Sequence, residues 1–450
     1  MALRTQYRAV CGRPRHQWRA TVKASISTNA VTNALTITIE GLNWEDLQQA
    51  SCYAGEVQVR ELLKVIGQEL TAQLLGSKDV DTPTLQREGK TYYRKAATLG
   101  HYQTLYGEVV LARHCYQSSA GGATLCPLED TCQLRFGSAT PLLAEVVSFK
   151  LASQTASEVA QDLAKSQGLT LCATYLHHLA QQVGQLAVDK HTAWHLEAAT
   201  TPTFVAIIAT GVDGTTIPLV GEDYKEAMCG TIALYDAQGA RVHTEYLGTM
   251  PEAGKTTFAQ RVTTQVARVK ARYPDALHVC LGDGAPWNWE FFATHYPEAV
   301  WVLDFYHAAT HLHSAAEALL GQGPEAEAYY ERWRTTLRDQ EDGVASLLRS
   351  LLYYRNRARL SASAQRALDT QLNYFRQHAA LMQYADFRAA GLPIGSGVTE
   401  AGCKELVKAR FCRSGMRWKR SSGTPILQLR AIKLSQQWDS FWSKVLRYAA

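Results

Sequence analysis

The order of strands and helices between residues 203 and 307 constrains the fold of this chain more than any other feature of its sequence. Three hydrophobic runs with the composition of β-strands follow one another without a helix between them, and then helices and strands alternate. Consecutive strands pair as a meander, whereas strands separated by helices are added in parallel. The sequence therefore predicts a mixed five-stranded sheet, with strands at 203–220, 224–236, 240–248, 276–286 and 299–307 and helices at about 252–273 and 287–296.

Isolated acids occupy informative positions in this order, which is the order of the ribonuclease H-like fold. Asp213 lies in the first strand and Asp283 ends the fourth. Neighbouring strands of that fold place these two carboxylates side by side, and the glycine after each aspartate leaves room for a ligand. Glu400 stands in GLPIGSGVTEAGCK, at the start of a helix that would close the sheet, with Ser396 as a plausible N-cap. The small residues 401–403 would let this helix pack closely.

Three converging carboxylates repel one another unless cations neutralise them. Hard oxygen ligands suit Mg²⁺ or Mn²⁺. Two such ions, roughly 3.5–4 Å apart, activate a water or a 3′-hydroxyl and stabilise the leaving oxygen of an in-line phosphoryl displacement. The pattern predicts Asp213, Asp283 and Glu400 as metal ligands and catalytic residues.

The basic residues are concentrated in two blocks, although the formal net charge is only +5. Residues 1–39 contain no acid, and residues 404–433 contain nine Lys or Arg against one acid. Blocks of this kind indicate a polyanionic partner. Cations beside the carboxylates could hold a phosphate backbone, and an aromatic side chain among them could stack on a base. Trp418 could equally pack in a core. The expected DNA contacts are Lys404, Lys408, Arg410, Arg413, Arg417, Trp418 and Lys419.

The chain resembles a known family in five ordered segments. These are GVDGTTIPL at 211, LGDGAPWNWE at 281, LDFYHAATHLH at 303, LPIGSGVTEAGCK at 392, and RSGMRW with the following LQLRAIKLSQQWDSFW. They look like the DDE transposases of bacterial insertion sequences, ISKra-four family. The likeness is close over 203–450 and loose upstream.

The resemblance implies a DDE triad of Asp213, Asp283 and Glu400, acting on DNA with two Mg²⁺ or Mn²⁺ ions. It also implies terminal inverted repeats and target DNA as substrates, a homodimer or higher assembly on DNA, and a bacterial, cytoplasmic, DNA-associated location. Asp304 and His307 match a D-x-x-H motif that supports catalysis in many relatives. His307 would contact the scissile phosphate or a flipped base, or be a structural histidine.

The expected organisation has five parts. An all-α insertion interrupts the ribonuclease H-like core, and DNA-binding regions precede it. Residues 154–186 read as helix, turn and helix, which suits either a helix-turn-helix or a plain αα-hairpin. The parts are an α+β domain for DNA-end binding (1–135), a helix-turn-helix-like region (136–200), the first part of the core (201–307), the insertion (308–390), and the end of the core with the basic segment (391–450).

The cysteines, the apolar runs and a P-loop-like segment bear on the metal, the partners and the rival functions to expect. The ten cysteines form no C-x-x-C pair, so we expect no zinc, although Cys115, Cys126, Cys132 and His114 could hold a metal. No apolar run is long enough to span a membrane, so we expect no membrane partner. Two other functions stay open: a catalytically inactive, transposase-derived DNA-binding protein, and an ATPase using the P-loop-like GTMPEAGKTT at 248–257, whose spacing has one residue too many.

Overall fold

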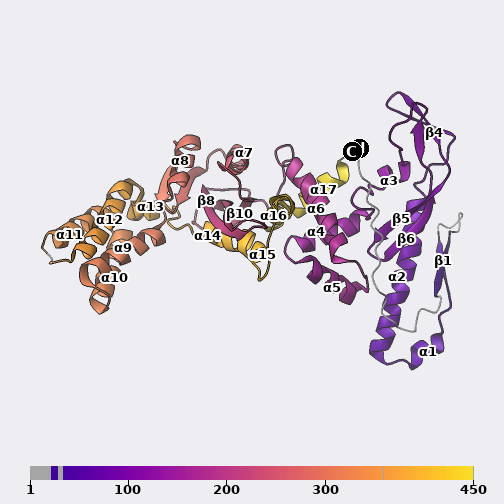
Figure 1. Ribbon diagram of the computed structural model, residues 1–450, viewed down its shortest axis with the longest axis horizontal. Coiled ribbons are helices and arrows are strands. Elements are labelled where there is room, and N and C mark those ends of the chain that lie inside the picture. Colours follow the sequence, from indigo (N-terminus) through magenta and orange to yellow (C-terminus); the bar gives the residue numbers. More distant parts are fainter. Residues whose placement is uncertain (1–21, 29–33, 358, 449–450) are drawn as a thin grey trace. The chain divides into compact units, whose positions relative to one another are not determined.

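A computed structural model describes residues 22–28, 34–357 and 359–448 of the chain (Figure 1). The chain is mixed α/β and divides into two units. The first contains the described residues up to Ala187, together with those from Trp442 onward, and the second spans Val188–Phe441. Most of the basic N-terminal block predicted from the sequence lies outside the described residues. No helix in the described ranges has a stretch long and apolar enough to cross a membrane.

The first unit opens with small antiparallel sheets around one long helix. The long helix is α2, and β5 and β6 form a hairpin beside it. β4 pairs with both β3 and β7. The elements are β1 (Lys23–Thr28), β2 (Leu35–Glu40), α1 (Trp44–Gln49), α2 (Cys52–Gly76), β3 (Thr84–Arg87), β4 (Lys90–Arg94), the hairpin β5 (Thr98–Thr104) and β6 (Gly107–Arg113), β7 (Tyr116–Ser118) and α3 (Pro127–Thr131).

Three helices follow: α4 (Pro141–Leu151), α5 (Ala156–Gln167) and α6 (Ala173–Asp189). A capping box of Thr155 and Glu158 starts α5, and Gly168, at φ 64°, ends it in the left-handed region where glycine is favoured. The predicted helix, turn and helix are therefore confirmed. A helix-turn-helix and an αα-hairpin share this geometry, so the choice between them stays open.

The second unit is built on the mixed five-stranded sheet that the sequence predicts. The strands lie in the order β10-β9-β8-β11-β12. The first three along the chain form an antiparallel meander, and β11 pairs in parallel with both β8 and β12. Their bounds are β8 (Ile207–Pro218), β9 (Tyr224–Tyr235), β10 (Arg241–Thr249), β11 (Leu277–Gly282) and β12 (Val300–Leu303).

Helices cover both faces of this sheet (Figure 1). Successive strand residues alternate between faces. In β8, Ile208 and Val212 join a core with α7 (Thr256–Arg272) and α8 (Pro286–His295). Ile207 and Ala209 instead join a core with the helices after β12. These helices are α9 (Phe305–Leu320), α10 (Pro324–Asp339), α11 (Gly343–Arg357), α12 (Ala362–His378), the 3₁₀ turn η1 (Ala379–Leu381) and α13 (Tyr384–Ala389).

The chain returns to the sheet after α13. The segment continues as α14 (Gly397–Gly402), the π-helical η2 (Cys403–Lys408) and α15 (Ala409–Phe411), followed by α16 (Arg420–Leu434) and α17 (Trp438–Arg447). Of the three small residues expected to allow close packing, Gly402 and Cys403 are buried and Ala401 is exposed. A Cβ on Gly402 would lie 3.0 Å from Cys229 and from Thr231 of β9. The buried hydroxyls of Thr399 and Thr231 hydrogen-bond at 2.7 Å.

Replacing Gly211 of β8 by alanine should destabilise the protein, because the added methyl group would overlap the Thr399 hydroxyl. Overpacking of this kind costs about 1–3 kcal/mol of the free energy of unfolding. Gly397→Ala in α14 is the matched control: a Cβ there meets no atom within 4 Å, so the variant should be as stable as the original or slightly more so. Urea denaturation measures both, and equal stabilities would show that α14 does not pack on β8.

Candidate active site

Asp213 and Asp283 lie side by side on one face of the sheet, Asp213 within β8 and Asp283 directly after β11. The parallel register pairs Leu281 of β11 with Gly211 of β8, so the two aspartates stand two residues further along each strand. Ile207 and Ala209 lie six and four residues before Asp213 and contribute to the core with α9. Because strand residues alternate between faces, both aspartates lie on the face that packs against α9 and α14. Neighbouring strands are about 4.8 Å apart, so the two carboxylates share one small region.

Asp213 is partly buried and its carboxylate is held by two donors. Its Oδ1 accepts from the Gly214 amide at 2.7 Å, and its Oδ2 accepts from the Cys403 thiol at 3.4 Å. Burial raises the pKa of Asp213, and the neighbouring charges of Asp283 and Glu400 raise it further. Asp283 and Glu400 therefore both lie close enough to act electrostatically on Asp213. Hydrogen bonding to Cys229 and burial raise the pKa of Cys403, which keeps that residue a neutral thiol donor.

Asp283 is fixed by the start of the next helix. Its Oδ1 accepts from the Ala285 amide at 3.0 Å and from Asn288 Nδ2 at 2.9 Å. Asn288 is buried in α8, so the amide holds the carboxylate from a rigid element. Gly284 follows at φ 95°, in the left-handed region, so the backbone conformation favours glycine at this position.

The two glycines that follow Asp213 and Asp283 differ in how closely other side chains approach them. A Cβ on Gly214 would overlap the carboxylate of Glu226, and one on Gly284 would lie 3.6 Å from Leu303 and Tyr374. The prediction that these glycines leave room for a ligand stays a prediction, because only the exposed Glu226 side chain lies close to either of them.

Glu400 is exposed on α14 and belongs to the same face. Thr399 packs on Gly211 and hydrogen-bonds Thr231, which fixes the turn that carries Glu400 against β8 and β9. Ser396 precedes the helix as expected, but its hydroxyl does not cap a backbone amide. It donates instead to Glu400 Oε1 at 3.3 Å.

Asp304 has a role in positioning. Its side chain is fully buried, and its Oδ1 accepts from the His307 amide at 2.5 Å and caps α9. Its Oδ2 accepts from the Ser396 amide. The backbone amide of Asp304 donates to Gly282 at 2.8 Å. One residue therefore joins the end of β11, the start of α9 and the loop before Glu400, and its buried carboxylate is not presented to a substrate.

His307 lies near aromatic residues of the helical insertion. Its ring is 5.0 Å from that of His311 and 6.2 Å from that of Tyr374, a residue of α12. Tyr374 stacks on His311 at 3.5 Å, and its buried hydroxyl has no hydrogen-bond partner among the described residues. Burial raises the pKa of Tyr374, and the charges of Asp304 and Asp283 add to the shift. The insertion thus reaches the region of the two aspartates.

The donor types suit a hard divalent cation, although the side chains are not arranged as a finished metal cage. Asp283 Oδ2 and Glu400 Oε2 form no hydrogen bond with other described residues, which leaves carboxylate oxygens available. Within the described ranges, no three Asp, Glu, His or Cys side chains are close enough to hold one ion. Binding would therefore draw Asp213, Asp283 and Glu400 closer together, as the charge of a cation favours.

Five of the seven expected DNA-contact residues are exposed: Lys404, Lys408, Arg413, Arg417 and Lys419. Lys404 and Lys408 follow Glu400 by four and eight residues. The backbone is π-helical from Cys403 to Lys408, with hydrogen bonds from i to i+5, so α-helical spacing does not give the face on which Lys408 lies. Helical periodicity cannot reveal such a change.

Arg410 and Trp418 do not belong to an exposed DNA surface. Arg410 is 2% exposed, and its guanidinium lies 5.0 Å from the Trp418 ring. Trp418 packs on Phe411, and its backbone pairs with Pro218 and Val220 at the end of β8. The core alternative is therefore the one observed for Trp418. The prediction that Arg410 contacts DNA is wrong in this structure, because its charge is stacked in the interior.

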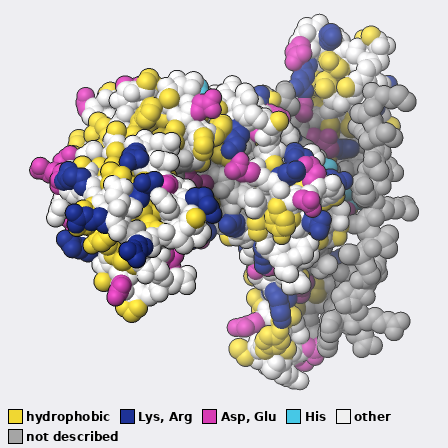
Figure 2. Space-filling view, turned by 60° about the vertical axis from the view of Figure 1, so that its left-hand side comes forward, with side chains coloured by type: hydrophobic (Ala, Val, Ile, Leu, Met, Phe, Trp, Pro, Cys, Tyr) yellow, Lys and Arg dark blue, Asp and Glu magenta, His cyan; other side chains and the backbone are white. Residues whose placement is uncertain are grey.

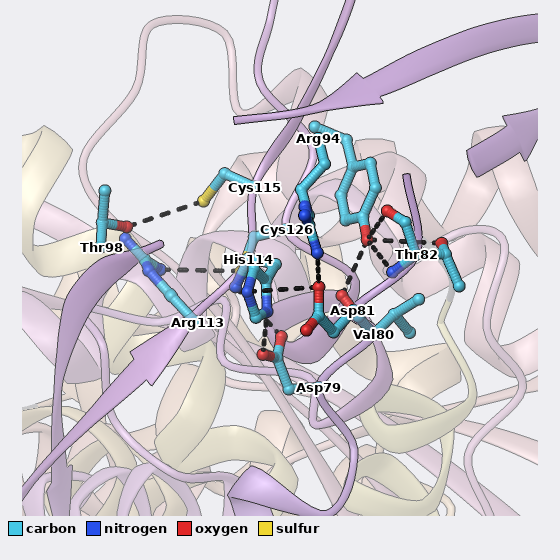
Figure 3. A network of polar contacts seen from close by, with 11 residues as sticks. Asp79, Val80, Asp81, Thr82, Arg94, Thr98, Arg113, His114, Cys115 and Cys126 are labelled. Carbon is cyan, nitrogen blue, oxygen red and sulfur yellow. Dashed lines mark hydrogen bonds and ion pairs between the residues drawn. The ribbon is translucent and has the colours of Figure 1, made fainter. Parts of the chain in front are cut away.

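The cysteine and histidine residues considered for a metal are engaged otherwise (Figure 3). His114 points toward Asp79, with Nδ1 to Oδ2 at 2.7 Å, and toward Asp81. Arg113 donates to the Cys126 thiol at 3.9 Å. Burial raises the pKa of Cys126 to about 11 and also raises that of Cys132, so both favour the neutral thiol. The network ties the loop 79–82 to β7 through His114 and Tyr116.

The P-loop-like segment does not form a phosphate cradle. It follows β10, an edge strand that pairs antiparallel, whereas a P-loop follows a strand of a βαβ unit. Glu252 Oε1 accepts from the Phe258 amide at 2.8 Å, where a phosphate would bind. Lys255 pairs with Glu226 at 2.7 Å and lies 4.6 Å from the Trp287 ring. These contacts argue against the ATPase alternative.

Comparison of the chain with protein-family models and with curated proteins finds no match.

The sequence had not pointed to Cys403, Asn288 or Tyr374 as neighbours of the aspartates. For Asn288 a signal existed, because an amide five residues after an aspartate can reach back from the first turn of a helix. Tyr374 carried none, since it lies 91 residues from Asp283 in an unrelated helix.

Asp213→Asn should raise the free energy of unfolding at neutral pH in a chelating buffer. The raised pKa means that the folded state holds the proton more tightly than the unfolded state. Stability is then lost as pH rises from about 4, the unfolded value, through the folded pKa. The gain in Asp213→Asn should therefore vanish below about pH 4. Thermal melts across pH measure this, with exposed Asp275→Asn as control; a gain independent of pH would refute the electrostatic origin.

Asp304→Asn should destabilise the fold although it is nearly isosteric. Two backbone N–H groups point at the carboxylate, and an amide nitrogen facing either one leaves a buried donor unsatisfied. The expected loss is about 1–3 kcal/mol. Ser361→Ala, which removes the exposed N-cap of α12, should cost only about 1 kcal/mol. Denaturant titrations compare the two, and a smaller loss in Asp304→Asn would contradict the positioning role.

Proposed function

We propose that the protein is a DDE transposase that cleaves DNA at the terminal inverted repeats of a mobile element and joins the ends to target DNA. Its core is of the ribonuclease H-like type, and its catalytic carboxylates are Asp213, Asp283 and Glu400. The observation that supports this best is the placement of two aspartates side by side on one face of neighbouring strands, with a third acid on a helix packed against that face.

The chain's residues divide the work of this reaction. Asp213 presents oxygens from within β8, Asp283 from the residue after β11, and Glu400 from α14. Two Mg²⁺ or Mn²⁺ ions bound there would activate a water or a 3′-hydroxyl and stabilise the leaving oxygen. Asp304 fixes the relative positions of β11, α9 and the loop before α14, and so holds the acids in register.

The exposed Lys and Arg side chains near Trp418 would bind the DNA backbone. Arg417 and Lys419 flank Trp418, whose backbone is paired with Pro218 and Val220. Pro218 is five residues beyond Asp213, which is about 17 Å along a strand. Cations there would bind backbone phosphates a few base pairs from the reacting bond. An element has two ends, so the active form would be a homodimer or larger assembly on DNA, in the bacterial cytoplasm.

A catalytically inactive descendant that only binds DNA is the second candidate. All three carboxylates are present, and the charges of Asp283 and Glu400 act on Asp213, which favours the active form. The two candidates share DNA binding and differ in cleavage, so one experiment separates them.

Asp213→Asn, Asp283→Asn and Glu400→Gln should each abolish cleavage of a duplex carrying the inverted repeats that flank the gene. Loss of a metal ligand removes several kcal/mol of transition-state stabilisation, so the rate should fall by about a thousandfold or more. DNA affinity in chelator should be unchanged or higher, since a negative charge is removed near phosphates. The measurement is gel analysis of labelled strands with Mg²⁺ or Mn²⁺.

The matched control is Glu405→Gln, an exposed acid in η2 whose backbone, rather than side chain, accepts from Arg430. It should cleave as the original chain does. Cleavage that survives in Glu400→Gln would place the third ligand elsewhere, and an original chain that binds the ends without cutting them would establish the inactive candidate.

A further inference from the structure

The helical insertion is divided by charge into two halves. Residues 308–342 carry three arginines and seven acids, whereas 343–378 carry six arginines, no lysine and one acid, Asp369. The excess of five positive charges in the second half equals the formal net charge of the whole chain, +5. A local charge of this size, in a protein that is otherwise balanced, indicates a place for a polyanion.

The arginines of α11, α12 and their connection are on the surface. Arg355 pairs with Asp369, and Arg349 pairs with Asp342 from the acidic half. Arg359 and Arg366 are exposed, and within the described ranges their side chains make no ion pair or hydrogen bond. Figure 2 shows Lys and Arg side chains gathered, with hydrophobic ones between them, on the forward face of this helical part. We call Arg349, Arg357, Arg359, Arg366 and Arg376 the arginine surface.

Tyrosines are interleaved with this surface. Tyr353 is 52% exposed and Tyr354 39%. The Arg357 guanidinium lies 4.6 Å from the Tyr353 ring and donates to its hydroxyl at 2.7 Å. Arginine with exposed aromatics suits phosphate contacts and stacking on bases, whereas solvated charge alone requires no aromatic.

The arginine surface is fixed relative to the candidate site. Leu347 and Leu351 of α11 and Leu368 and Leu372 of α12 share one buried core with strands β8, β11 and β12. Tyr374 of α12 reaches Gly284, next to Asp283. Arg366 precedes Tyr374 by eight residues, which is about 12 Å along a helix, or the length of about four base pairs.

We propose that the arginine surface binds the phosphodiester backbone of the DNA that the site cleaves, at the flank beside the reacting bond. The identity of this DNA rests on the proposed function. The location of the binding surface rests on the charge of α11 and α12 and on their contacts with the core of the sheet. Five exposed guanidiniums supply cations for backbone phosphates, and the exposed Tyr353 beside Arg357 supplies a ring on which a base could stack.

Arg366→Glu should weaken binding of the full chain to a fluorescein-labelled duplex by about five- to tenfold at moderate salt. The plot of log K against log salt should become shallower by about 0.9, because one fewer phosphate is neutralised. Arg359→Glu should act in the same way. Fluorescence anisotropy in chelator measures binding without cleavage. The control, Arg332→Glu, makes the same charge change at an exposed arginine of the acidic half and should bind as the original does.

The outcomes are distinguishable from those of the triad variants. Normal binding and an unchanged salt slope in Arg366→Glu and Arg359→Glu would overturn the inference while leaving the triad proposal intact. Normal DNA binding with impaired self-association in sedimentation would assign the surface to the acidic half of a second copy, and so also overturn it. If Arg366→Glu and Arg359→Glu bind DNA weakly while the triad variants still cleave it, DNA binding by the arginine surface is supported and the proposed function is contradicted. Misfolding is excluded if Arg366→Glu and Arg359→Glu melt at the same temperature as the original chain and Arg366→Gln weakens DNA binding less than Arg366→Glu does.

Discussion

The candidate site depends on a buried carboxylate, that of Asp304, which is not presented to solvent. Its two oxygens accept from backbone amides of α9 and of the loop before α14, and its own amide donates to the end of β11. A buried charge is tolerated only when donors surround it, so these bonds are strongly coupled to the fold. Glu400 and Asp283 keep their relative places because the same residue constrains both segments.

The sequence predicted the sheet and its two aspartates because strand order and side-chain alternation are local, periodic properties. Asp213 and Asp283 follow from the adjacency of the first and fourth strands, and Glu400 from a helix start beside small residues. The structure bears out this sheet order, and the roles of the three acids stay predictions.

The wrong predictions share a cause, since each concerned where a side chain goes after the backbone has folded. Arg410 looked like part of a basic surface, but it stacks on Trp418 in the interior. Ser396 was expected as the N-cap of α14, but its hydroxyl donates to the Glu400 carboxylate instead. Residues that arrive from distant segments, such as Tyr374, leave no trace in local sequence.

The contact between Asp304 and Ser396 closes a loop of 92 residues, and Glu400 follows it within the last ninth of the chain. During synthesis the meander and β11 emerge first, so both aspartates are in place while the third acid is still unmade. A polypeptide that stops before residue 391 would carry the arginine surface without Glu400. If the chain acts as proposed, such premature products would bind DNA ends without cleaving them and compete with the complete protein, so the efficiency of translation would limit how often the element moves.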